Sequence, residues 1–292
     1  MGKMTNADPI GLFDSGIGGF SIMRALRKHL PQENMVFLSD NARHPYGSKS
    51  EMRLRSISLG NSRFLNRHGS KMIVVACNTA SAVTKEYLSE KFDTGIVGVI
   101  DAGVRAAVKH TRNGKIGVIG TRQTIASGSH EKKILEIRSD AEVFSKSTPL
   151  FAPIVEEGYL ENPSTDMLIR EELRQFAEID VDTLILGCTH YPFLADKISS
   201  LLGDHITLID PAEETAREIR YMLELTGQLN RSDTRPWTYV YSSDPSGSVL
   251  LPSSFSVTED MIFKAVDVEE LEIGSDAPEL ITPKMEEELL SL

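Results

Sequence analysis

The sequence contains two cysteines, and each follows a short apolar run and precedes residues with polar side chains. Cys77 lies in VVACNTAS at 74–81, and Cys188 lies in TLILGCTHYP at 183–192. Taken alone, either thiol is more often a buried apolar residue than a reactive group. The two settings match, however, and a matched pair of thiols can serve as general base and general acid when their pKa values are tuned toward neutrality.

Two thiols that face each other across a ligand suit the inversion of a carbon with an acidic C–H. One thiolate removes the proton from one face, and the opposite thiol returns a proton to the other face without a cofactor. We expect the helix N-terminus after each cysteine to favour the thiolate over its free pKa of about 8.5. Three groups are positioned to assist. Asp14 is expected near Cys77, His190 near Cys188, and Glu156 in a loop at the same edge.

These residues alternate with segments that have the patterns of strands and helices. The expected strands are Ile10–Phe13, Met35–Ser39, Met72–Ala76, Ile96–Ile100, Ile116–Ile119, Ala141–Phe144, Thr183–Leu186, Ile206–Ile209 and Trp237–Tyr241. The expected helices lie at 21–30, 50–69, 101–111, 166–180 and 211–227. Alternation of this kind is typical of parallel sheets covered by helices, so the sequence predicts an α/β fold.

A weak internal repeat indicates two halves. IGLFDSG at 10–16 resembles IGVIGTR at 116–122, and VVACNTAS resembles LILGCTHY at 184–191. We therefore expect two pseudo-symmetric parallel-sheet α/β domains that face each other across a central cleft. The expected boundaries are 1–100 plus about 211–273 for the first domain, 101–210 for the second, and 274–292 for an acidic C-terminal tail.

Polar residues follow five of the expected strands. In parallel α/β sheets, ligands bind beyond the carboxyl ends of the strands. The segments at these ends are Asp14-Ser15, Pro45-Tyr46-Gly47, Cys77-Asn78-Thr79, Thr121 and Cys188-Thr189-His190. The turn DSGIGGFS at 14–21 does not read as a dinucleotide loop, because Ser21 replaces its third glycine and a carboxylate would repel a pyrophosphate. One small-molecule site at this edge is the better interpretation.

A zinc site is the main alternative role for the cysteines. Cys77, Cys188 and His190, with His44 or Asp14, include suitable donors, but C-x-H is not a usual ligand spacing and C-x₂-C does not occur. We therefore expect no metal and no other cofactor. The remaining histidines are interpreted as surface residues: His29, His68, His110, His130 and His205.

Composition limits the partners. The net charge is −11, and residues 259–292 hold eleven acidic side chains against Lys264 and Lys284, which favours a solvated tail over a partner-binding segment. The remainder has no basic stripe for nucleic acid. No apolar run approaches the roughly 20 residues of a membrane span, and the N-terminus has no apolar export core. We expect a cytoplasmic protein with reduced thiols and no membrane partner.

Several segments together resemble the glutamate racemases of the cofactor-independent aspartate/glutamate racemase superfamily. They are GLFDSGIGGFS, HPYGSKS, VVACNTASA, GVIGTRQTI, PIVEEG, LILGCTHYPFL and LIDPAEETA, in that order, over residues 10–216. The resemblance implies two facing α/β domains with glutamate between them. It also implies interconversion of L- and D-glutamate without a cofactor, a supply of D-glutamate for peptidoglycan synthesis, and a homodimer.

The same resemblance assigns roles to residues. Cys77 and Cys188 are implied as the catalytic thiols, with Asp14, His190 and Glu156 as their helpers. The residues implied to hold the substrate are Asp14, Ser15, Pro45, Tyr46, Gly47, Asn78, Thr79, Thr121, Thr124, Thr189 and His190. The sequence departs from the family pattern at Ser39-Asp40-Asn41, where Gly-Asp-Thr is expected. Two alternatives stay open: a racemase of aspartate or another small acid, and an amino-acid-binding regulator without catalysis.

Overall fold

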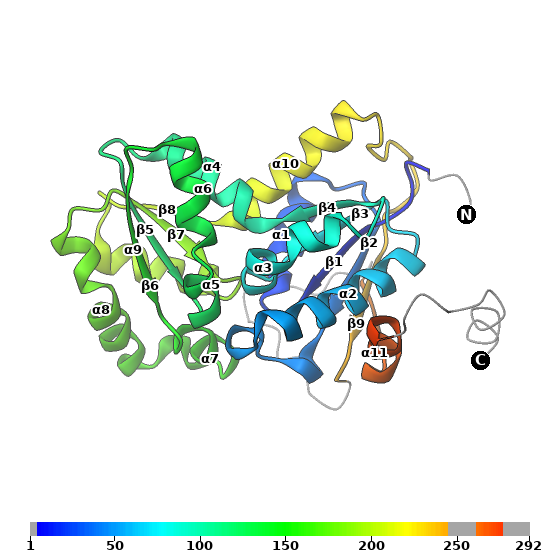
Figure 1. Cartoon of the computed structure of the whole chain (residues 1–292), viewed down its shortest axis with the longest axis horizontal. Coiled ribbons are helices and arrows are strands. Elements are labelled where there is room, and N and C mark those ends of the chain that lie inside the picture. Colours follow the sequence, from blue (N-terminus) through cyan, green and yellow to red (C-terminus); the bar gives the residue numbers. More distant parts are fainter. Residues whose placement is uncertain (1–4, 245–260, 277–292) are drawn as a thin grey trace.

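A computed structural model describes residues 5–244 and 261–276, which form two β-sheets covered by helices (Figure 1). The larger sheet has the strand order β10-β9-β2-β1-β3-β4, and the smaller sheet has the order β6-β5-β7-β8. All the strand pairings of both sheets are parallel. The predicted α/β fold class is confirmed.

The strands agree closely with the sequence pattern. The larger sheet contains β1 (Ile10–Asp14), β2 (Met35–Ser39), β3 (Met72–Val75), β4 (Gly95–Gly98), β9 (Thr238–Ser242) and β10 (Met261–Ala265). The smaller sheet contains β5 (Lys115–Gly120), β6 (Glu142–Ser147), β7 (Thr183–Gly187) and β8 (Thr207–Ile209). Two differences stand out. The expected strand at 96–100 ends early because helix α4 begins at Val99, and β10 was not predicted.

Apolar side chains on alternate sides of the larger sheet explain its two helical layers. Ile10 and Leu12 of β1 belong to one core, whereas Phe13 belongs to the other, as the two-residue period of a strand requires. The first core includes apolar residues of α1 (Gly19–His29) and α10 (Pro211–Leu225). The second includes residues of α2 (Glu51–Arg67) and α3 (Asn78–Ser89). β1 is therefore buried on both faces, which holds the residues after it in a fixed position.

The smaller sheet has an apolar core on each face, and five helices lie within the same part of the chain. These helices are α5 (Arg122–Ala126), α6 (Ser129–Ile137), α7 (Phe151–Glu156), α8 (Pro163–Glu178) and α9 (Ala195–Leu202). The chain leaves the larger sheet through α4 (Val99–His110) and returns through α10, and these two helices pack together. The domain boundaries at residues 100 and 210 stay a prediction. None of the helices in the described ranges combines the length and hydropathy that a bilayer crossing requires.

The acidic end of the chain corrects one prediction. Helix α11 (Val268–Asp276) packs against α2, and Leu271 is fully buried in the core beneath it. Arg53 Nη2 lies 2.7 Å from Glu272 Oε1, so the helix is also paired electrostatically. The prediction of a solvated segment is therefore wrong for the face of α11 that carries Leu271, whereas the acidic side chains of Asp267, Glu269 and Glu270 are exposed, as predicted. Residues 277–292 of the predicted tail lie outside the described residues.

His130 corrects a second prediction, because it is buried rather than on the surface. Its side chain is 3% exposed, and its ring would lie 3.5 Å from a Cβ atom added at Gly187. Within the described ranges neither ring nitrogen has a hydrogen-bond partner. Burial and, to a lesser extent, the charge of Lys133 together lower the pKa of His130 to about 4. The sequence carried a signal, since His130 lies four residues before the buried Ile134 on the same helix face.

The other four histidines of that prediction differ among themselves. His110 and His205 are exposed, as predicted. His29 and His68 are half-buried, with a ring nitrogen 2.7 Å from Glu213 Oε2 and 3.1 Å from the Tyr241 hydroxyl, respectively.

We expect His130 to make the protein less stable in acid. An imidazole binds a proton near pKa 6.5 in the unfolded chain but near 4 in the folded one, so the unfolded state takes up more protons between these values. The stability of the fold is therefore unaffected by His130 above pH 6.5 and falls by about 3 kcal/mol as the pH drops toward 4. Urea unfolding between pH 4 and 7.5 measures this loss. His130→Leu should remove this component, and an unchanged pH profile in that variant would contradict the assignment.

Candidate active site

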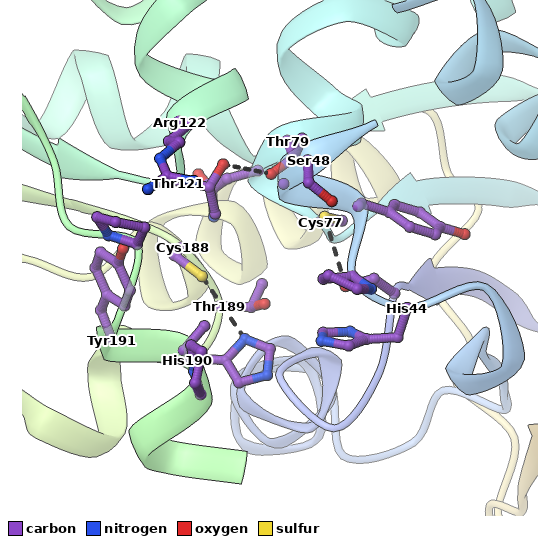
Figure 2. Close-up of a pocket in the computed structure, with 18 residues that line it drawn as sticks. His44, Ser48, Cys77, Thr79, Thr121, Arg122, Cys188, Thr189, His190 and Tyr191 are labelled. Atoms are coloured by element: carbon purple, nitrogen blue, oxygen red, sulfur yellow. Dashed lines mark hydrogen bonds between the residues drawn. The ribbon is translucent and has the colours of Figure 1, made fainter. Parts of the chain in front are cut away.

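A cavity of about 190 Å³ lies at the carboxyl ends of strands from both sheets. Figure 2 shows Cys77 and Cys188 reaching it from opposite sides. Most of the site residues expected from the sequence line it: Ser15, Pro45, Tyr46, Gly47, Cys77, Asn78, Thr79, Thr121, Cys188, Thr189 and His190. The other three expected residues, Asp14, Thr124 and Glu156, do not line the cavity and are connected to it only through other side chains.

Cys77 lies two residues after the end of β3 and is the N-cap residue of α3. Its Sγ lies 4.0 Å from Ser15 Oγ, and the backbone amides of Ala80 and Thr79 favour the thiolate. Burial and, to a lesser extent, the charge of Asp14 nevertheless raise the pKa of Cys77 to about 12. The prediction that the helix N-terminus lowers the pKa is wrong for this structure, because desolvation of the thiolate outweighs the two amides.

Cys188 directly follows β7, but no α-helix begins beside it in the structure. A short 3₁₀ turn, η4 (Tyr191–Leu194), separates it from α9. Burial raises the pKa of Cys188 well above its ordinary value, and the backbone amide of His190 only partly opposes this. Both thiols therefore carry their protons at neutral pH in this structure.

His190 connects Cys188 to a carboxylate. Its Nδ1 lies 3.6 Å from Cys188 Sγ, and its Nε2 lies 2.8 Å from Glu156 Oε1. With a proton on Nε2 toward the carboxylate, Nδ1 is the acceptor that faces the thiol. Burial opposes ionisation of Glu156, but hydrogen bonds from His190 and His44 outweigh it and lower the pKa to about 2. Glu156 ends helix α7 rather than lying in the expected loop.

Asp14 lies behind the cavity wall and is fully buried. Its Oδ2 accepts hydrogen bonds from the backbone N–H groups of Gly16 at 3.2 Å and Gly19 at 3.1 Å. Its Oδ1 lies 3.4 Å from Thr189 Oγ1, which donates to it from the opposite side. Burial raises the pKa of Asp14, and the charge of His190 works against this rise. The carboxylate therefore fixes the glycine-rich turn and contacts a cavity-lining residue from the smaller-sheet side.

Three threonines join the two sides at one wall of the cavity. Thr79 Oγ1 lies 2.9 Å from Thr121 Oγ1 and 3.1 Å from Thr124 Oγ1, and Thr121 and Thr124 are 2.9 Å apart. Thr121 also caps helix α5 by accepting a hydrogen bond from the backbone of Thr124. Thr79 and Thr121 thus present hydroxyl groups to the cavity, with Thr124 supporting them from behind.

A buried network holds the loop that carries Tyr46. The Tyr46 hydroxyl donates to Asp40 Oδ2, and Arg43 Nε lies 2.9 Å from both oxygens of that carboxylate. Ser243, just after β9, donates to Asp40 Oδ1 at 3.0 Å. Burial raises the pKa of Tyr46, and the negative charge of Asp40 adds to the rise. The loop on the larger-sheet side is therefore fixed by a strand from the far end of the chain.

The departure from the family pattern at 39–41 lies next to this network. Ser39 Oγ donates to Asn41 Oδ1 at 2.9 Å, and Asn41 Nδ2 donates to Ser242 Oγ at 3.1 Å. The unexpected Ser39 and Asn41 thus add contacts to the end of β9 and do not line the cavity.

Several residues that line the cavity were not predicted from the sequence. They are His44, Ser48, Arg122, Pro149, Ala152, Pro153 and Tyr191. The sequence pattern indicated His44 only as a metal donor, although its place next to Pro45 could have identified it as a lining residue. Within the described ranges, no three His, Cys, Asp or Glu side chains converge as a metal site would require.

Comparisons with known proteins agree on one family. The Asp/Glu/Hydantoin racemase family profile matches residues 21–219. The glutamate racemase of Chlorobaculum tepidum is 41% identical over 83% of this chain and 89% of its own length, and that of Oceanobacillus iheyensis is 38% identical over 91% and 97%. The crystal structure of glutamate racemase from Thermus thermophilus in complex with β-chloro-D-alanine superimposes with a TM-score of 0.82, at 38% identity over 91% of this chain and 99% of that one. The Francisella tularensis glutamate racemase, solved with D-glutamate, has a TM-score of 0.77 at 33% identity over 82% of this chain and 89% of that one.

Proposed function

The chain belongs to the Asp/Glu/Hydantoin racemase family, and from this premise we propose that it interconverts L-glutamate and D-glutamate through Cys77 and Cys188. The observation that carries the proposal is the entry of two thiols into one cavity from opposite sides (Figure 2). An α-carbon held between them presents its C–H bond to one sulfur and its other face to the second sulfur. Proton removal on one side and proton return on the other inverts that carbon.

The reaction conserves protons within the pair. A thiolate on one side forms an S–H bond with the α-proton, and the electrons of the broken C–H bond pass into the α-carboxylate system. The opposite thiol then gives its proton to the other face of the carbon and becomes the thiolate. One turnover thus inverts the substrate and exchanges the protonation states of the two cysteines, and the total number of protons on the pair is unchanged.

The resting thiols must lose a proton before they can act as bases. The ammonium group of a bound amino acid places a positive charge in the cavity, and an opposite charge a few ångströms away lowers the pKa of a thiol. On the Cys188 side, His190 Nδ1 at 3.6 Å is positioned to receive the proton. Glu156, with its pKa held near 2, stabilises the imidazolium that results.

The cavity wall supplies donors for two carboxylates. Side chains that offer hydroxyl or amide N–H groups there include Ser15, Ser48, Asn78, Thr79 and Thr121. Pro149, Ala152 and Pro153 form an apolar part of the wall. A dicarboxylic amino acid matches this mixed lining, because its two carboxylates need donors and its methylene groups need apolar contact.

The cellular role follows from the product. D-glutamate is consumed in peptidoglycan synthesis, so we place the protein in the cytoplasm as a supplier of that precursor. The proton transfers described above need no cofactor, and the protein is assigned none. We assign it a homodimeric state, as the family resemblance implies.

Isotope exchange tests the function directly. In deuterated water, purified protein without any added cofactor should replace the α-hydrogen of L-glutamate and of D-glutamate and should bring either one to an equal mixture. Proton NMR follows the exchange, and chiral chromatography follows the inversion. L-aspartate treated in parallel serves as the test of substrate choice. Failure of both glutamate isomers to exchange, or a requirement for pyridoxal phosphate, would show the proposal to be wrong.

A further inference from the structure

His44 contacts Glu156 from the larger-sheet side of the cavity. It lies in the loop after β2, lines the cavity and places its Nε2 3.0 Å from Glu156 Oε2. The other oxygen of the same carboxylate lies 2.8 Å from His190 Nε2. One carboxylate therefore bridges two imidazoles, one from each side of the cavity, and Figure 2 shows both rings on the same side of the thiols.

We propose that His44 is a positioning residue of the reaction: it anchors Glu156 and thereby keeps the His190 ring within reach of Cys188. The effect of His44 on catalysis rests on the proposed function, whereas its effect on the reactivity of the Cys188 thiol does not. The contacts run in one chain, from Cys188 to His190, from His190 to Glu156, and from Glu156 to His44.

Glu156 needs a second anchor because of its place in the fold. It is the last residue of the six-residue helix α7, and its side chain is 26% exposed, so water competes for its oxygens. A carboxylate with only one partner can rotate toward solvent, and His190 would then lose the acceptor that fixes its ring. The His44 ring, with Nε2 3.0 Å from Oε2, occupies that oxygen and leaves Oε1 for His190.

Charge supports this contact. Burial lowers the pKa of His44, but Glu156 and, more weakly, Asp14 outweigh this and raise it. The His190 ring is the third titratable group nearby, with its centroid 6.2 Å from that of His44. The two carboxylates thus favour a ring at position 44 that donates to Glu156.

The contact serves one thiol and not the other. In the part of the chain that the structure describes, the Cys77 sulfur is paired with Ser15 Oγ at 4.0 Å, and no imidazole lies within hydrogen-bonding distance of it. Loss of His44 should therefore change Cys188 and spare Cys77. Direction of turnover cannot reveal this difference, because enantiomers have equal free energies and kcat/KM must be equal in both directions.

Labelling of the two cysteines at pH 7.5 tests the inference. Wild type, His44→Phe and His44→Gln are treated with iodoacetamide, and peptide mass spectrometry gives the alkylation rate at each cysteine. In His44→Phe we expect the Cys188 rate to fall at least threefold relative to the Cys77 rate, because His190 no longer faces the thiol. His44→Gln should keep the wild-type ratio within twofold, since its amide can still donate to Glu156. His205→Gln, at an exposed position, is the matched control.

Kinetics provide the second measurement. His44→Phe should lower kcat/KM for glutamate about tenfold, the order expected for one lost hydrogen bond to a charged group, while His44→Gln should stay within threefold of wild type. In a Glu156→Ala background, His44→Phe should have no further effect, because the contact runs through that carboxylate. Thermal unfolding of each variant checks that the fold is retained.

The outcomes separate the two proposals. Three results would each overturn the role of His44. The first is an equal change in alkylation rate at both cysteines, and the second is a His44→Gln variant whose alkylation ratio and kcat/KM are no closer to wild type than those of His44→Phe. The third is a His44→Phe variant with wild-type kcat/KM. If the wild-type protein fails to racemise glutamate, the proposed function fails, and the ratio of alkylation rates still decides whether His44 acts on Cys188.

Discussion

Replacement of either Cys77 or Cys188 by serine is expected to lower kcat/KM for glutamate racemisation by at least about 10³-fold. A serine hydroxyl is a far weaker acid than a thiol, so it neither forms a base near neutral pH nor returns a proton at a useful rate. The change in side-chain volume is small, and the cavity should keep its shape. Circular dichroism of the amino acid measures inversion from each enantiomer, and thermal unfolding verifies the fold of each variant.

The two variants should also differ from each other in a reciprocal way. Each keeps one thiol, which can still remove the α-proton from the enantiomer that presents it to that sulfur and return a deuteron to the same face. In deuterated water, Cys77→Ser should exchange one enantiomer without inverting it, and Cys188→Ser should exchange the other. The double variant removes both cysteines of the chain and should exchange neither. Full racemisation by either single variant would exclude the two-thiol mechanism.

Substitution of Gly18 by alanine should lower kcat/KM about 100-fold while leaving the fold in place. A Cβ atom at this position would overlap Thr189 Oγ1 and lie 2.7 Å from two atoms of the His190 ring. The backbone of Gly18 is helical, with φ −56° and ψ −33°, and alanine can adopt this conformation without strain. The loss of activity would therefore come only from the steric contact of the added Cβ atom. The Thr189-His190 segment must shift, and a displacement of about 1 Å at a reacting group can cost about 10²-fold.

Gly95 provides the matched control for this substitution. A Cβ atom added there meets no other atom within 4 Å, so Gly95→Ala should keep wild-type activity. Steady-state kinetics on both variants, together with thermal unfolding, separates a displaced His190 from a general loss of stability. Wild-type kcat/KM in Gly18→Ala would mean that the close approach of the glycine turn to Thr189 has no role in catalysis.

Features set by local pattern were predictable from the sequence. β1, β2 and β3 are short apolar runs followed by a turn. Such strands are recognisable in the sequence because the residues that define them are adjacent in the chain. Because parallel strands end at one edge, the residues after them converge, and the sequence alone is enough to pair Cys77 with Cys188. Position at the strand ends also indicated Asp14 and Glu156, and the family resemblance added Thr124; these three residues lie close to the cavity but behind its wall.

Features set by packing between distant elements were not predictable. The pKa of Cys77 depends on how completely both sheets exclude water, and no local pattern measures that quantity. His44 gains its importance from Glu156, which is more than a hundred residues away in the chain. Helix α11 was missed because its acidic composition outweighed the signal of the apolar residue Leu271, which is buried in the core. In each case a contact across the fold outweighed the local signal.

Synthesis on the ribosome gives the position of β9 a further consequence. Strand β2 is paired by β1 on one side and by β9 on the other, yet β9 is made roughly 200 residues later. At about 5–20 residues per second this delay is roughly 10–40 s. During this delay, one edge of β2 is unpaired in the nascent chain, and an unpaired strand edge can act as a template for aggregation. All four strands of the smaller sheet emerge within that interval, so the inserted half can fold before its host is complete.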